Sequence, residues 1–156
     1  MKFAKENIDQ TSQFPALFGS EIYKSMPLFS YAEHLFYCGM KQMIATYSGG
    51  KFDFYKIVQA DVDIEPLGFI PMINQDHNVQ LESPHGASET LSYKAACLVV
   101  WLFVIEQIAY KSTDEIQQQI YRTMQDIRYC YSRATNEEGE LYFSQQDCTA
   151  IHKLID

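Results

Sequence analysis

The sequence predicts an α+β fold, in which a small antiparallel sheet of three or four strands packs against about four helices. A helical pattern at residues 29–47 comes first, short alternating segments follow between residues 51 and 82, and helical patterns fill most of residues 88–156. A sheet with one apolar face needs helices to cover that face. This order of elements therefore favours one sheet with helices packed on it.

The composition is typical of a single globular domain. Of the 156 residues, 47% are hydrophobic and 21% are charged, and a chain of this length buries about two-thirds of the surface it exposes when unfolded. No internal repeat or low-complexity linker divides the chain. We therefore expect one domain over residues 1–156, with residues 1–27 as an irregular arm that the aromatic residues of segment 14–19 anchor on the body.

A pair of glycines separates the first helix from the strand after it. Apolar residues recur at helical spacing over residues 29–47. Gly49 and Gly50 can adopt the left-handed conformation that commonly ends a helix. Residues 51–58 are rich in aromatic and β-branched side chains, which favour a strand. We expect helix, turn and strand in that order.

Three more short segments have the character of strands. Residues 61–65 alternate acidic and aliphatic side chains, residues 68–73 are mostly apolar, and residues 78–82 alternate again. Pro84 and Gly86 follow, and both residue types interrupt strands. We expect the sheet to end there.

The rest of the chain reads as three helices. The second helix should span residues 88–110 and the third residues 112–133, with Ser112 and Glu115 forming a capping box at its start. A polar, acidic loop at residues 136–140 precedes a last helix that begins near Ser144.

Nothing in the sequence predicts secretion or insertion into a membrane. Residues 1–7 contain no apolar signal region. The longest apolar run, residues 95–105, is shorter than the about 18–20 residues that a membrane span requires, so we expect a buried core helix. The cysteines are widely spaced without a C-x-x-C pair, which is typical of reduced thiols; they are Cys38, Cys97, Cys130 and Cys148. We expect a cytoplasmic protein.

The charge of the chain argues against direct binding to nucleic acid. The formal net charge is −8, and the twelve Lys and Arg residues form no continuous basic stripe in the sequence. The acidity leaves two interpretations open. It can imitate the charge of DNA toward a DNA-binding partner, or it can serve solubility alone.

The sequence contains no recognisable metal or catalytic motif. The four histidines lack the H-E-x-x-H spacing or a comparable ligand pattern; they are His34, His77, His85 and His152. In a strand, Asp61, Asp63 and Glu65 would lie on one face about 7 Å apart. Such a row can be simply solvated or can hold a divalent cation. We expect no metal, cofactor or catalytic residue, and a metal-dependent enzyme that uses this row is the alternative.

One segment resembles a known family. Tyr47-Ser48-Gly49-Gly50-Lys51-Phe52-Asp53-Phe54-Tyr55 is similar to the Y-x-G-G-x-[WF]-D-F-Y segment of KlcA/ArdB-type antirestriction proteins. Residues 14–19, 93–109 and 150–156 resemble other parts of that family in the same order, so the resemblance spans nearly the whole chain. The acidic segment 133–148 is longer than in the family, and Phe52 replaces a tryptophan found in some members.

The resemblance implies a protein of plasmids and other mobile elements that relieves type I restriction of incoming plasmid or phage DNA. We expect it to act non-catalytically through a host restriction-related protein, directly or indirectly, and a structural subunit of a larger complex is a further alternative. The candidate partner-binding residues are Asp53, Tyr55 and Asp156. The motif residues should be mainly structural; they are Tyr47, Gly49, Gly50, Phe52, Asp53, Phe54 and Tyr55.

Overall fold

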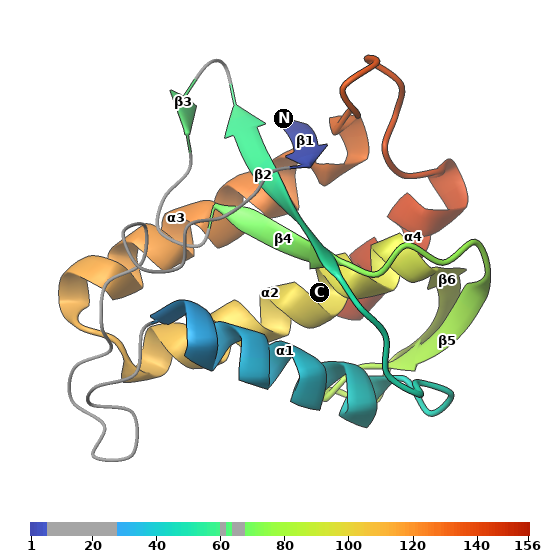
Figure 1. The fold of residues 1–156 in the computed structure, drawn as a ribbon, viewed down its shortest axis with the longest axis horizontal. Coiled ribbons are helices and arrows are strands. Elements are labelled where there is room, and N and C mark those ends of the chain that lie inside the picture. Colours follow the sequence, from blue (N-terminus) through green and yellow to red (C-terminus); the bar gives the residue numbers. More distant parts are fainter. Residues whose placement is uncertain (6–27, 60–61, 64–67) are drawn as a thin grey trace.

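The computed structural model describes residues 1–5, 28–59, 62–63 and 68–156 (Figure 1). Within these residues the protein has the expected α+β fold, with four α-helices and six strands in two antiparallel sheets. In chain order the elements are β1 (Lys2–Lys5), α1 (Leu28–Met43), β2 (Asp53–Gln59), β3 (Val62–Asp63), β4 (Phe69–Met72), β5 (Asn78–Glu82), β6 (Ser88–Ser92), α2 (Tyr93–Lys111), α3 (Asp114–Cys130), the 3₁₀ turn η1 (Tyr131–Arg133) and α4 (Gln145–Ile155).

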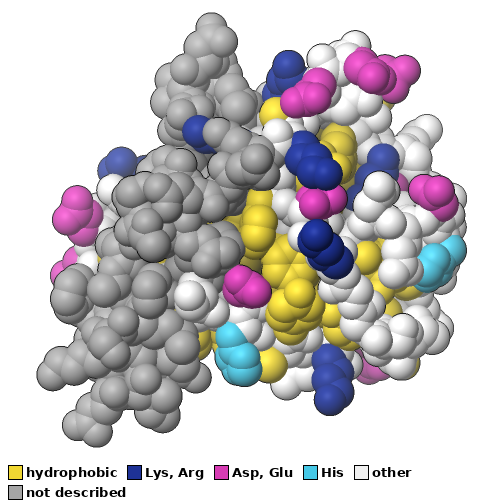
Figure 2. Space-filling model, viewed as in Figure 1, with side chains coloured by type: hydrophobic (Ala, Val, Ile, Leu, Met, Phe, Trp, Pro, Cys, Tyr) yellow, Lys and Arg dark blue, Asp and Glu magenta, His cyan; other side chains and the backbone are white. Residues whose placement is uncertain are grey.

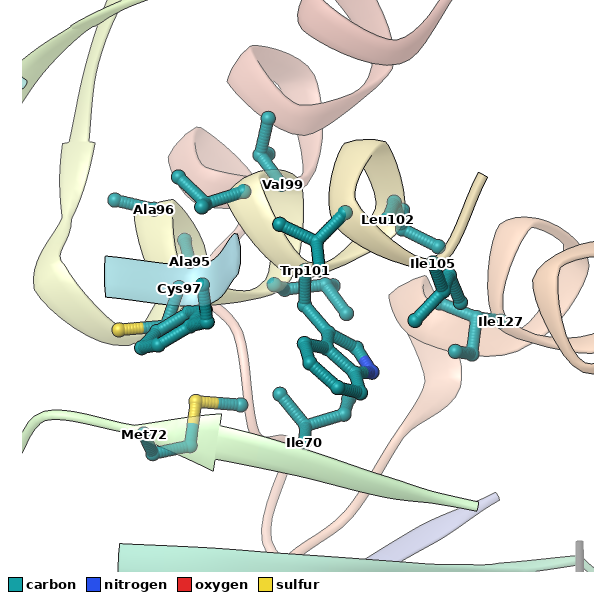
Figure 3. Packing of buried hydrophobic residues seen from close by; sticks show 14 of the residues in the cluster. Ile70, Met72, Ala95, Ala96, Cys97, Val99, Trp101, Leu102, Ile105 and Ile127 are labelled. Carbon is teal, nitrogen blue, oxygen red and sulfur yellow. The ribbon is translucent and has the colours of Figure 1, made fainter. Parts of the chain in front are cut away.

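Helix α2 forms the centre of the core. Thirteen of its nineteen residues are buried, and they lie on all sides of the helix. A helix that is apolar all round must be enclosed by other elements. Helices α1, α3 and α4 and strands β4, β5 and β6 all pack against it. Figure 3 shows the indole of Trp101 pointing from α2 toward β4, beside Ile70, and the Trp101 ring lies 5.1 Å from that of Phe69.

The length and hydropathy of α2 would suffice for a membrane span. In the fold, however, 72% of the apolar stretch of this helix is buried inside the protein. The expectation that residues 95–105 belong to a buried core helix is confirmed, because these side chains are enclosed by other elements of the same chain.

The first sheet is built around β2. Tyr55 pairs with Lys5 of β1 on one side and with Ile70 of β4 on the other. β3 pairs with the last residues of β2, on the edge that also carries β4. Among the described residues this sheet therefore has four strands and is three strands wide. It includes β1, which the sequence did not predict, whereas the predicted strand of residues 78–82 lies in a second sheet. All four residues of β4 are buried, so both of its faces are covered.

A second sheet, the hairpin β5–β6, corrects the predicted start of the second helix. Residues 88–92 form a strand that pairs in register with β5, from Asn78 opposite Ser92 to Glu82 opposite Ser88. Pro84 and Gly86 lie in the hairpin turn and do not end the sheet, and Gly86 has a φ of +86°. The helix begins at Tyr93 because Ser92 is its N-cap and accepts a hydrogen bond from the Ala95 N–H.

Two other predicted boundaries differ in the structure. Helix α1 ends at Met43, before the glycine pair, and a turn occupies the following residues. The capping box of Ser112 with Glu115 is not formed. Ser112 is instead the C-cap of α2, and its hydroxyl donates to the Ile108 carbonyl at 2.7 Å. Thr113 takes the N-cap position of α3, and its side chain makes no capping hydrogen bond.

The start of the last helix is confirmed, and a buried carboxylate fixes it to the core. Ser144 is the N-cap of α4 and accepts from the Asp147 N–H at 3.1 Å. The buried Asp147 carboxylate accepts from the Ser92 N–H at 2.8 Å and from the Ser92 hydroxyl at 2.7 Å. One side chain therefore connects the first turn of α4 with the first turn of α2.

The predicted N-terminal arm is described only in part. Residues 1–5 are not irregular, because residues 2–5 form β1, and the buried Phe3 ring packs on Tyr142 and Phe143. Segment 14–19, with its predicted anchoring aromatics, lies outside the described residues.

The close contact between α1 and α2 depends on a glycine. A Cβ atom at Gly39 would lie 2.8 Å from Val100 Cγ1 and 3.4 Å from Val104 Cγ2. We expect Gly39→Leu to lower the free energy of unfolding by about 1–3 kcal/mol, because the added side chain has no space. Urea unfolding followed by circular dichroism measures the change. Gln42→Leu, at an exposed site on the same helix, is the control, and an equal loss in both variants would contradict the steric explanation.

The connection between Asp147 and Ser92 gives a second prediction. We expect Asp147→Ala to lower the free energy of unfolding by about 3 kcal/mol, because it removes two hydrogen bonds to a charged acceptor and leaves the Ser92 donors unpaired. The same unfolding measurement applies. Gln146→Ala, at an exposed position of the same helical turn, should change stability far less. Similar midpoints for wild type and Asp147→Ala would show that the bonds contribute little.

Candidate functional site

The motif segment is held in place by its glycines and its aromatic rings. Gly49 and Gly50 have φ values of +97° and +150°. Residues other than glycine rarely adopt a backbone conformation with positive φ. Phe52 then enters an aromatic cluster, where its ring centroid lies 5.3 Å from that of Phe36, 4.9 Å from Tyr37 and 5.1 Å from Phe54. The two glycines and Phe52 therefore contribute to the position of β2, which begins at Asp53.

Tyr47, the first residue of the motif, also faces the interior. Its hydroxyl is buried and has no hydrogen-bond partner among the residues that the structure describes, and burial raises the pKa of the phenol. A buried hydroxyl without a partner is unfavourable for the fold. Its partly buried ring nevertheless packs against the core.

Asp53 lies at the surface and pairs with the N-terminal strand. Its Oδ2 lies 3.0 Å from Lys5 Nζ, and the two side chains are 38% and 61% exposed. The hydrogen bond from Lys5 to Asp53, with the attraction between their charges, raises the pKa of Lys5. Because both groups face solvent, the pair adds little stability. Asp53 remains accessible on one side.

Tyr55 lies next to Asp53 and meets a tyrosine from the far end of the chain. Its ring centroid is 6.1 Å from that of Tyr142, and Lys94 Nζ lies 4.8 Å from the centre of the Tyr142 ring. Burial raises the pKa of Tyr142. A cation over a tyrosine ring is attracted by its π-electrons. The surface here combines aromatic and charged groups.

Two small cavities flank this tyrosine pair. One, of about 300 Å³, is lined by the loop residues 74–78 together with Ser92 and Lys94. The other, of about 310 Å³, is lined by Phe3, Lys5 and residues 136–138. Tyr55 and Tyr142 line both. On this face, basic side chains lie in a row that also contains acidic side chains, and exposed hydrophobic side chains lie beside this row (Figure 2).

The acidic loop is ordered by one side chain. Asn136 Oδ1 accepts from the N–H groups of Glu138 and Glu140 at 2.9 and 3.0 Å, and the loop turns through Gly139 with a φ of +83°. Glu137 and Glu138 are exposed at the rim of the second cavity. The segment of residues 133–148 therefore lies against the motif strand, because Tyr142 packs on both Phe3 and Tyr55.

Asp156, the third predicted residue, belongs to a different surface. Its Oδ2 lies 2.9 Å from His152 Nδ1, and both side chains are exposed. It lines a groove of about 620 Å³ between α3, α2 and the end of α4, whose floor includes Met124, Tyr131 and Ile155. Neither cavity beside Tyr55 includes Asp156. The structure brings Asp53 and Tyr55 together and leaves Asp156 apart from them.

Sequence reasoning missed several residues of these surfaces. Tyr142 and Lys94 were not predicted, because a tyrosine in a loop and one lysine in a helix carry no local signal. The groove next to α3 also includes Tyr121, Arg128 and Tyr129. The sequence contains a signal for this surface, because these residues recur at helical spacing and every arginine of the chain lies within residues 122–133.

The acidic row proposed for a metal lies mostly outside the described residues. Asp61 and Glu65 are not described, and Asp63 is part of β3. Among the residues that are described, no group of three or more His, Cys, Asp or Glu side chains could hold a metal ion.

The four cysteines form no disulfide, and only Cys97 is fully buried. Burial raises the pKa of Cys97 to about 12, so this thiol is protonated at neutral pH. His34 Nε2 and Cys38 Sγ lie 3.7 Å apart on the exposed side of α1.

No protein-family model matches the chain, and no curated protein sequence matches it. Among solved structures, one from work on the KlcA and ArdB proteins is similar to this chain with a TM-score of 0.59 and 20% sequence identity. The match covers 97% of this chain and 100% of the other. That work describes a novel fold and antirestriction activity against type I DNA restriction systems in vivo but not in vitro. The chain described here has a KlcA/ArdB-like fold.

Proposed function

We propose that this protein is an antirestriction protein, which relieves type I restriction of incoming plasmid or phage DNA. It acts without catalysis, in the cytoplasm, through a host restriction-related protein. The observation that carries the proposal is the likeness of fold over 97% of the chain, together with the motif of residues 47–55.

The requirement for a host protein is supported by the behaviour of the similar protein. Its activity occurs in vivo but not in vitro. Such a difference is expected when an activity needs a cellular component that is missing from a purified assay. The net charge of −8 also disfavours direct contact with a phosphate backbone.

The accessible groups of the motif strand favour recognition of a protein. Tyr55 lies beside Tyr142, Lys94 and the acidic loop, on a surface with two cavities. Asp53 pairs with Lys5, which lines one of these cavities. Aromatic side chains surrounded by charged groups are typical of protein interfaces. Asp156 offers a second contact point at the end of α4.

Plating of unmodified phage on cells with a type I restriction system tests the proposal. We expect cells that express the wild-type protein to plate phage more efficiently than cells without it. A variant with Asp53→Ala and Asp156→Ala should lose this protection, because it removes one carboxylate from each candidate surface. Because the two residues lie on separate surfaces, each single variant shows which surface the partner uses.

The control is Glu82→Ala, which removes an exposed carboxylate from β5. It should protect as well as the wild type, and circular dichroism confirms that each variant is folded. Equal restriction with and without the wild-type protein would refute the proposed function. Full protection by the double variant would keep the function and exclude both carboxylates from partner binding.

A further inference from the structure

The solvent face of α3 has an unusual composition for an acidic protein. All three arginines of the chain lie between residues 122 and 133. At 100° per residue, Tyr121 and Arg128 lie on one side of this face, Arg122 and Tyr129 lie on the other, and Gln125 lies between them. The acidic residues of α3 fall at its first turn and at the edge of the face.

These arginines are not neutralised within the protein. Arg122 and Arg128 are exposed, and neither forms an ion pair with any residue that the structure describes. The exposed acids of this protein are numerous, yet none of the described ones lies within salt-bridge distance of this face. The guanidinium groups are thus free to bind carboxylates from another molecule.

The same face borders a groove with an apolar floor. Tyr121, Arg128 and Tyr129 line the groove of about 620 Å³, above Met124 and Ile155. Tyr129 is 70% exposed and Tyr121 is 40% exposed, so both rings project into water. Tyrosine, arginine and methionine are enriched where proteins bind one another, and an apolar centre with a polar rim is the usual arrangement.

The charges in the groove distinguish a protein from a nucleic acid. Glu106 and Asp156 form part of its wall, and a phosphate backbone carries one charge about every 3.4 Å along each strand. A continuous row of phosphates would meet these carboxylates. A protein segment can place its own carboxylates opposite the arginines only, with apolar side chains over the floor.

We propose that the face of α3 formed by Tyr121, Arg122, Met124, Arg128 and Tyr129 binds an amphipathic, acidic helix of a partner protein. Its apolar residues enter the groove beside Tyr129, and its carboxylates accept paired hydrogen bonds from the guanidinium groups of Arg122 and Arg128. The nine residues from Tyr121 to Tyr129 span about 12 Å along the helix axis, which matches about two turns of such a helix. The identification of this helix with the host partner rests on the proposed function.

A defined probe tests the surface independently of restriction. The probe is a synthetic amphipathic peptide with leucines at helical spacing and glutamates at the flanking positions, and its counterpart carries lysine in place of each glutamate. In ¹⁵N–¹H spectra at low ionic strength, we expect the glutamate peptide to shift the amide signals of residues 121–131. The lysine peptide and oligothymidylate should not shift them.

Two variants with matched controls make the result specific. Arg128→Glu should weaken binding of the glutamate peptide about tenfold or more, whereas Lys41→Glu, the same charge change on the exposed surface of α1, should not. Tyr129→Ala should weaken it as well, whereas Tyr110→Ala, which is 71% exposed on α2 but outside the groove, should not. The spectra themselves report whether each variant is folded.

Several results would overturn this inference. They are the absence of shifts with the glutamate peptide, equal binding of both peptides, and equal effects of the variants and their controls. Shifts of the same signals by oligothymidylate would indicate that the surface binds nucleic acid instead. Plating with Arg128→Glu then tests the connection to restriction. If the wild type gives no protection although the glutamate peptide binds at α3, the proposed function fails and the docking surface stands.

Discussion

The enclosure of α2 is the constraint on which the rest of this structure depends. Because its apolar side chains point in every direction, no single layer can cover it, and helices α1, α3 and α4, the first sheet and the hairpin each supply one side. Each surrounding element commits its apolar face to this purpose. At Gly39 the covering is so close that even a methyl group would meet Val100. What remains on the outside is therefore the part of the sequence that is free to serve binding.

The predictable parts of the fold were those with local signals. The glycine pair, the strand of residues 69–72 and the cap at Ser144 follow from residues next to one another. Strand β6 did not, because its sequence Ser-Glu-Thr-Leu-Ser contains one apolar residue and lies directly before a strongly apolar helix. Ser92 ends that strand, caps α2 and donates to Asp147, 55 residues later. Sequence patterns cannot reveal a boundary that depends on such a distant partner.

The candidate surfaces divide in the same way. The packing role of Phe52 could be foreseen from its place in the motif strand, and the geometry of its aromatic cluster agrees. The neighbours of Asp53 and Tyr55 could not be foreseen from the sequence, because Lys5 comes from the first strand and Tyr142 from a loop near the other end of the chain. These contacts join both ends of the sequence at the motif. The segment that carries the acidic loop therefore forms part of the surroundings of the motif strand.

The net charge of the protein and the arginines of α3 act over different distances. At physiological ionic strength, electrostatic interactions in water are screened over about 8 Å. The overall charge of −8 repels a long anionic polymer as it approaches, but contributes much less to a contact at Arg128. A carboxylate that reaches α3 meets guanidinium groups that are unpaired among the described residues. An acidic protein can thus exclude DNA from its surface and still bind an acidic segment of another protein.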